Sequence, residues 1–144
     1  FAGTVPVRHL LPYWKTSNRY LFSGGSVNMR DAAVYAKEEN WSKAVELWKQ
    51  TYETKKGKQK MYAAYNTALG YEMQDSIDTA LEWALKAQTL AREKSKTDKK
   101  ETGEIHNGTI SYYIFISMYV DELEKRKEGM ARLNMQMNRF DDDF

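Results

Sequence analysis

Two stretches of this sequence repeat the same arrangement of small and large side chains, and this internal repeat restricts the possible folds more than any other feature. A shift of 36 positions places Ala32 on Ala68, Tyr35 on Tyr71 and Ala44 on Ala80. A period of this length is typical of solenoids, because one helix pair cannot bury its apolar face alone and a second stacked pair can. The sequence therefore predicts two similar helix pairs packed against each other.

The positions of proline separate an extended segment from a helical one. Both prolines, Pro6 and Pro12, lie near the start of the chain, and proline breaks helix interiors. From Val27 onward, apolar residues recur at helical spacing. We therefore expect one all-α domain with three parts: an extended arm over residues 1–25 that packs on the rest, two helix pairs over 26–95, and a linker with a long capping helix over 96–140.

The repeated pattern resembles the tetratricopeptide repeat (TPR). The signature of that family combines a small residue, a tyrosine, a later alanine and a final aromatic residue. The matching residues are Ala32, Tyr35, Ala44 and Trp48 in the first repeat, and Ala68, Tyr71 and Ala80 in the second, where Ala84 replaces the aromatic residue. The resemblance implies a TPR-like α-α superhelix of two helix hairpins, although no proline closes either repeat.

A narrower resemblance is to the C-terminal half of an uncharacterised family of Bacteroidetes cell-envelope lipoproteins. The residues that carry it are Trp14, Arg19-Tyr20, Asn40-Trp41-x-x-Ala44-x-x-x-Trp48, Tyr65-Asn66-x-Ala68-Leu69-x-x-Glu72 and Ala80-x-x-Trp83. The resemblance implies an exported parent protein in the cell envelope, which is periplasmic or attached to the outer membrane. It places the lipid anchor upstream of this chain and implies no established activity.

The composition and the motifs of the chain argue against several function classes. The chain has no cysteine, which excludes a disulfide framework, a zinc ribbon and a catalytic thiol. It has 22 basic and 20 acidic residues, and a net charge of +2 does not favour binding of nucleic acid or membrane by the whole chain. His9 and His106 are far apart and lack paired metal-ligand spacing. We therefore expect no enzyme activity, no metal and no cofactor.

The resemblance to TPR proteins implies a concave groove lined by the first helix of each pair. Asn66 matches the position at which peptide-binding members hold ligand backbone or carboxylate, and Arg30 occupies the position of a second clamp residue. The implied groove residues are Arg30, Lys37, Tyr62, Tyr65 and Asn66. Two alternatives follow: the groove binds a peptide or protein partner, or the arm or the long helix fills it from within and the domain is purely structural.

A basic cluster follows the second predicted helix. Its residues are Lys55, Lys56, Lys58 and Lys60. Such a rim could bind anions or nucleic acid with salt-dependent affinity. No aromatic residue interleaves the cluster in sequence, so stacking on bases is not favoured, and solvation of the loop is the simpler interpretation.

Three further expectations concern burial. Trp48, Tyr71 and Trp83 fit the core between helices. Glu72 and Asp75 lie at a predicted helix end, where we expect solvated carboxylates. The long helix is expected from Ile110 to Met137, with its charged stretch, residues 121–128, in solvent.

Overall fold

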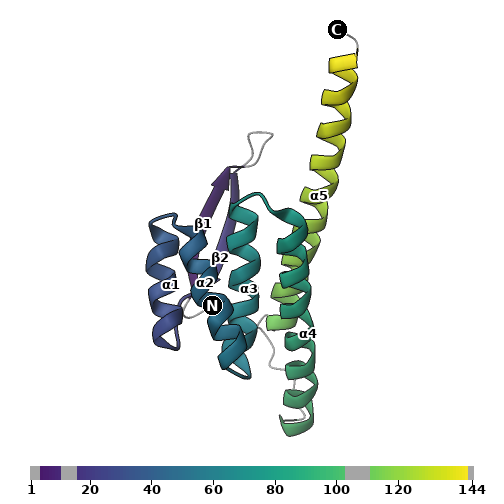
Figure 1. The fold of residues 1–144 in the computed structure, drawn as a ribbon. Helices are drawn as coiled ribbons and strands as arrows, with labels where there is room; N and C mark the ends of the chain where they lie inside the picture. The colour runs from purple at the N-terminus through teal and green to yellow at the C-terminus, as the bar shows by residue number, and fades with distance from the viewer. Residues whose placement is uncertain (1–3, 11–15, 103–110, 143–144) are drawn as a thin grey trace.

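A computed structural model of the chain describes residues 4–10, 16–102 and 111–142. The elements are β1 (Thr4–Leu10), β2 (Thr16–Phe22), α1 (Val27–Lys37), α2 (Trp41–Thr54), α3 (Lys58–Met73), α4 (Ile77–Thr102) and α5 (Tyr112–Asp142). The fold is mostly helical with one small hairpin (Figure 1), so the predicted all-α class is confirmed. Trp14, His106 and linker residues 103–110 lie outside the described residues.

The two helix pairs, α1 with α2 and α3 with α4, repeat down to the geometry of their turns. Glu39 and Asp75, which are 36 positions apart, both have left-handed backbone conformations, with φ of 61° and 62°. The amide after each donates to a tyrosine carbonyl: Asn40 N to Tyr35 O at 2.8 Å, and Ser76 N to Tyr71 O at 2.9 Å. Both turns thus end the first helix of a pair with the same cap. The left-handed residue turns the chain so that the following amide can bond to a carbonyl of the last helical turn.

The small residues of the repeat allow the helices to approach closely. Ala32 and Ala68 have no exposed surface, and neither do Ala44 and Ala80. Gly70 serves the same purpose, because a side chain there would collide with Val45 of α2. The result is that α3 is buried on all sides from Met61 to Gly70, apart from half-buried Tyr62, and is the central helix of the domain.

The segment expected as an extended arm contains an antiparallel hairpin that packs on α3. β1 pairs with β2 from Thr4 opposite Phe22 to Leu10 opposite Thr16. The backbone carbonyls of Tyr20 and Phe22 accept hydrogen bonds from side chains of α3. At these two positions the N–H and C=O groups of β2 therefore point away from β1. Pro6 lies opposite Tyr20 and therefore faces the outer edge of β1, where its missing N–H disfavours pairing with a further strand.

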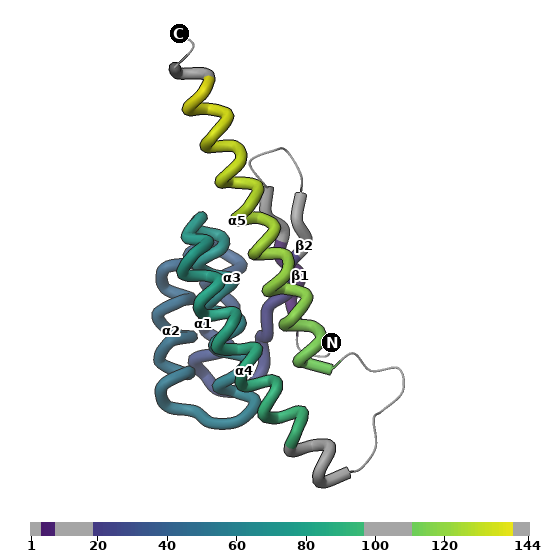
Figure 2. The backbone as a smooth tube through the Cα atoms, turned by 90° about the vertical axis from the view of Figure 1, so that its right-hand side faces the viewer, coloured from purple at the N-terminus to yellow at the C-terminus, as the bar shows by residue number. Residues whose placement is uncertain are grey.

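The long C-terminal helix is α5, which has 31 residues and a length of about 46 Å at 1.5 Å per residue. Ile116, Tyr119, Val120 and Leu123 are buried in its first half, where it packs beside α4 (Figure 2). Its second half extends beyond the rest of the molecule, with residues 131–139 exposed.

Trp48 of α2 has no exposed surface, which confirms its predicted place in the core. We expect Trp48→Ala to lower the free energy of unfolding by about 3–5 kcal/mol, the usual cost of removing a large buried ring. The measurement is chemical denaturation of the full chain. Leu85→Ala, at a position that is 43% exposed, is the control and should cost less than about 1 kcal/mol. Equal losses in the two variants would contradict the assignment.

Candidate functional site

The groove implied by the sequence is occupied by the chain itself. Tyr65 and Asn66 of α3 are 2% and 0% exposed, because β2 lies across them. These two side chains therefore do not line an open groove but lie beneath the segment that was expected as the arm. Tyr62 is half-buried at the margin of the same contact.

The side-chain amide of Asn66 bonds to both backbone groups of Phe22 in β2, as a neighbouring strand would. Its side-chain oxygen accepts from Phe22 N at 2.9 Å, and its side-chain nitrogen donates to Phe22 O at 2.7 Å. The hydroxyl of Tyr65 donates to Tyr20 O at 2.6 Å. These bonds satisfy the outer backbone groups of β2, which would otherwise be buried without partners.

An aromatic cluster fills the space between β2, α3 and α5. Phe22 stacks on Tyr62 with ring centroids 4.2 Å apart and meets the edge of Tyr65 at 5.2 Å. Tyr65 in turn contacts Tyr119 of α5 at 5.0 Å, and the hydroxyl of Tyr62 bonds to that of Tyr112 at 2.8 Å. Such ring pairs add to the free energy of apolar burial, so the cluster fixes both the hairpin and α5 on α3.

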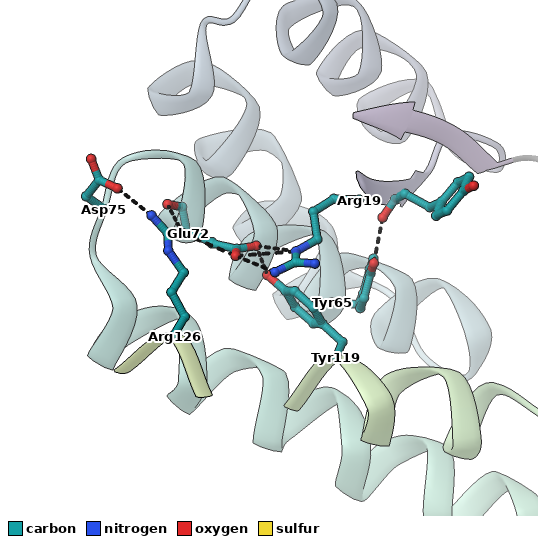
Figure 3. Close-up of polar contacts among 7 residues, drawn as sticks. Arg19, Tyr65, Glu72, Asp75, Tyr119 and Arg126 are labelled. Carbon is teal, nitrogen blue, oxygen red and sulfur yellow. Dashed lines mark hydrogen bonds and ion pairs between the residues drawn. The ribbon is translucent and has the colours of Figure 1, made fainter. Parts of the chain in front are cut away.

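At the end of α3, the carboxylate of Glu72 joins the same three segments (Figure 3). Glu72 has no exposed surface. Arg19 of β2 donates to it through Nε and Nη2, each at 3.0 Å, and the hydroxyl of Tyr119 donates at 2.9 Å. Arg126 of α5 donates through Nη1 at 3.2 Å. The prediction that Glu72 is a solvated carboxylate is therefore wrong.

Arg126 also caps the C-terminus of α3. Its Nη1 donates to the backbone carbonyl of Glu72 at 3.3 Å, and its Nη2 to the carboxylate of Asp75 at 2.7 Å. A positive charge at this end of a helix interacts favourably with the helix dipole. Arg126 is 2% exposed, so the expectation that residues 121–128 are solvated fails at this position and at buried Leu123. Asp75 itself stays exposed, as expected.

Burial and the charge of Glu72 shift the pKa values of Arg19 and Tyr119 in this cluster. Burial acts to lower the pKa of Arg19, but the hydrogen bond and negative charge of Glu72 outweigh it and the pKa is raised. Burial, followed by the charge of Glu72, raises the pKa of Tyr119 well above its ordinary value. Burial also raises the pKa of Tyr65. Arg19 thus stays charged, and Tyr65 and Tyr119 stay neutral and act as hydrogen-bond donors.

The other two predicted groove residues lie apart from this cluster. Arg30 and Lys37 are exposed on α1. Lys37 borders a pocket of about 300 Å³ between the hairpin and the start of α2, together with Val7, Leu21 and Trp41. The structure therefore does not bring Arg30 and Lys37 together with the three residues of α3.

Two lysines of the predicted basic rim point into solvent, and the other two lie over aromatic rings. Lys55 and Lys56 are exposed at the end of α2. Lys58 lies over the ring of Tyr112 at 5.9 Å and Lys60 over that of Tyr52 at 4.8 Å. The rim therefore does contain aromatic residues in space, although none interleaves the lysines in sequence.

The described residues contain neither a metal-binding cluster nor a membrane-spanning helix. Across residues 4–10, 16–102 and 111–142, no group of three or more His, Asp or Glu side chains is placed to hold a metal ion. In the same ranges, no helix is both long enough and apolar enough to cross a membrane.

The Glu72 cluster was missed because its partners are remote in sequence. Arg19 is separated from Glu72 by 53 positions and Arg126 by 54. One signal was present: Arg126 falls on the apolar stripe of α5, three positions after Leu123. A charged residue on a buried stripe requires a partner of opposite charge.

We expect Glu72→Gln to lower the free energy of unfolding by about 3–5 kcal/mol, because it leaves two arginines buried without their balancing charge. Denaturant unfolding measured at neutral pH tests this. Asp75→Asn removes a carboxylate that also bonds to Arg126, but its side chain is 64% exposed, so the loss should stay below about 1 kcal/mol. If Glu72→Gln were as stable as Asp75→Asn, the cluster would not hold the segments together.

Comparison with known proteins gives one match. No curated protein and no solved structure matches the chain. Residues 30–125, from α1 to the first half of α5, match a family described as a domain of unknown function, DUF6340. That range includes Asn66, Glu72 and Tyr119 but begins after the hairpin. Because the match covers well over half of the sequence, the chain belongs to the DUF6340 family.

Proposed function

We propose that this domain is a helical-repeat scaffold whose groove holds the chain's own hairpin and long helix instead of an external peptide. The observation that carries the proposal is the pair of hydrogen bonds between Asn66 and the backbone of Phe22. They use the amide that the TPR resemblance assigns to ligand binding. A competing peptide would have to replace these bonds and also expose the ring of Phe22, which is 3% exposed.

The state of the buried polar groups supports a non-enzymatic role. Glu72 and Tyr65 are saturated by protein partners and have almost no contact with solvent. General acid or base catalysis requires a group within hydrogen-bond reach of a substrate. We therefore propose that the tyrosines and the glutamate of this cluster stabilise the fold.

We further propose that the parent protein is an exported lipoprotein of the bacterial cell envelope. This proposal rests on the resemblance of the sequence to the Bacteroidetes lipoprotein family. In the proposed role, the domain is a rigid unit carried by an upstream lipid anchor and meets protein partners through its outer surface. Recovery of the parent protein from the soluble cytosol, with none in the envelope fraction, would contradict it.

The groove proposal is tested with Asn66→Ala in the full chain. The variant leaves the N–H and C=O of Phe22 buried without partners, so we expect it to lower the free energy of unfolding by about 2–4 kcal/mol. Arg30→Ala, on the exposed face of α1, is the control and should change it by less than about 0.5 kcal/mol. The measurement is denaturant unfolding followed by circular dichroism.

A second readout separates a filled groove from an open one. In the scaffold account, the amide of Phe22 exchanges with solvent as slowly as the amides of α3. If Asn66→Ala had wild-type stability and the Phe22 amide exchanged at the rate of an unstructured peptide, the hairpin would not occupy the groove. An external ligand would then be the better account.

A further inference from the structure

Three lysines and three aromatic rings alternate along one band of the surface formed by α2, α3 and α4. Tyr52 lies between Lys60 and Lys86, whose ammonium groups are 4.8 and 5.9 Å from its ring centre. Trp83 lies between Lys86 and Lys49, at 4.1 and 5.8 Å. The rings of Tyr52 and Trp83 meet edge to face at 5.0 Å, which links α2 to α4.

The band ends at Tyr71, whose ring is 5.0 Å from the ammonium group of Lys49. All three rings are half-buried. Tyr71 and Trp83, which we expected in the core between helices, are therefore only partly buried. We name the six residues the Lys–aromatic band: Lys49, Tyr52, Lys60, Tyr71, Trp83 and Lys86.

The lysines of the band are not neutralised by the glutamates nearest to them in sequence. Glu82 precedes Lys86 by four positions, the favourable arrangement for an ion pair on a helix. In the described part of the chain, however, no carboxylate forms an ion pair with Lys49, Lys60 or Lys86. The ammonium groups instead lie over ring faces, a contact worth about 0.5–1 kcal/mol at exposed sites.

The location of the band separates it from the filled groove. α2 lies on the side of the helical layer away from the hairpin (Figure 2). None of the six residues takes part in the hydrogen bonds around Asn66 or Glu72. The band therefore involves different residues from those that hold the hairpin in the groove.

We propose that the Lys–aromatic band is a docking surface for an acidic segment of a partner protein. Carboxylates of the segment pair with the ammonium groups of Lys49, Lys60 and Lys86, which the rings already hold in place. Neutral side chains between those carboxylates pack on the exposed parts of Tyr52, Trp83 and Tyr71. Aromatic residues supply much of the binding energy at protein interfaces, and charge complementarity sets the register of the partner.

The charges around the band favour a peptide over a dense polyanion. Glu46, Glu53 and Glu82 are exposed on the same two helices that carry Lys49 and Lys86. A nucleic acid or an anionic membrane would bring closely spaced phosphates against these carboxylates. A peptide with separated carboxylates can meet the lysines and avoid the glutamates. The ring faces also hold ammonium groups, so they are not free to stack on bases.

The test uses the full chain and a fluorescein-labelled peptide in which glutamate alternates with neutral residues, some of them aromatic. Its matched control peptide has glutamine in place of every glutamate. Binding is measured by fluorescence anisotropy. We expect the acidic peptide to bind and the glutamine peptide to bind roughly tenfold or more weakly, because the lysines then lose their charge partners.

Two charge-matched variants locate the site. Lys49→Gln, Lys60→Gln and Lys86→Gln together should weaken binding roughly tenfold or more. Lys55→Gln, Lys56→Gln and Lys58→Gln remove the same charge outside the band and should leave the affinity close to that of the wild type. Thermal melts of both triple variants control for folding.

Four results would overturn the proposal. Equal weakening in the two triple variants would show a non-specific response to net charge. Absence of binding by the acidic peptide would exclude an acidic segment as the partner of the band. Tighter binding of single-stranded oligothymidylate, or of vesicles rich in phosphatidylglycerol, would assign the band to nucleic acid or to membrane instead.

Discussion

The carboxylate of Glu72 brings a negative charge into the interior, and two separate segments supply the groups that balance it. Arg19 comes from the hairpin, whereas Tyr119 and Arg126 come from α5. A buried ion without partners costs several kcal/mol, so the end of α3 reaches its native environment only when both segments are docked. A buried ion pair adds little net free energy to folding, but removal of one partner destabilises the fold strongly, because the other charge is then buried alone. We infer that this one specifies where the hairpin and α5 lie.

The hairpin and α3 also depend on each other, because each supplies hydrogen-bond partners to buried polar groups of the other. A two-stranded hairpin is marginal by itself in water, and its outer backbone groups need partners when they are buried. Asn66 and Tyr65 supply those partners, and β2 in return removes both side chains from water. The contact that a helical repeat would use for a foreign peptide is thus used within one molecule. In the scaffold that we propose, a partner of the folded domain meets another surface.

The helices could be predicted from sequence because their determinants are local. The alanines of the repeat lie within the helices that they specify, and Asn40, which caps α2, directly precedes that helix. The cluster around Glu72 could not be predicted, since burial of that carboxylate is decided by residues 47 to 54 positions away. The arm was expected to be extended, but its pairing into β1 and β2 depends on contacts with α3.

Native-state hydrogen exchange of the full chain tests most directly whether Glu72 joins the three segments into one cooperative unit. The account predicts that slowly exchanging amides in β2, α3 and the first half of α5 share one opening free energy. Their exchange rates should also respond together as denaturant is added. If the amides of β2 or α5 opened at a much lower free energy while those of α3 stayed protected, the segments would be docked independently. The buried carboxylate would then not be what holds them together.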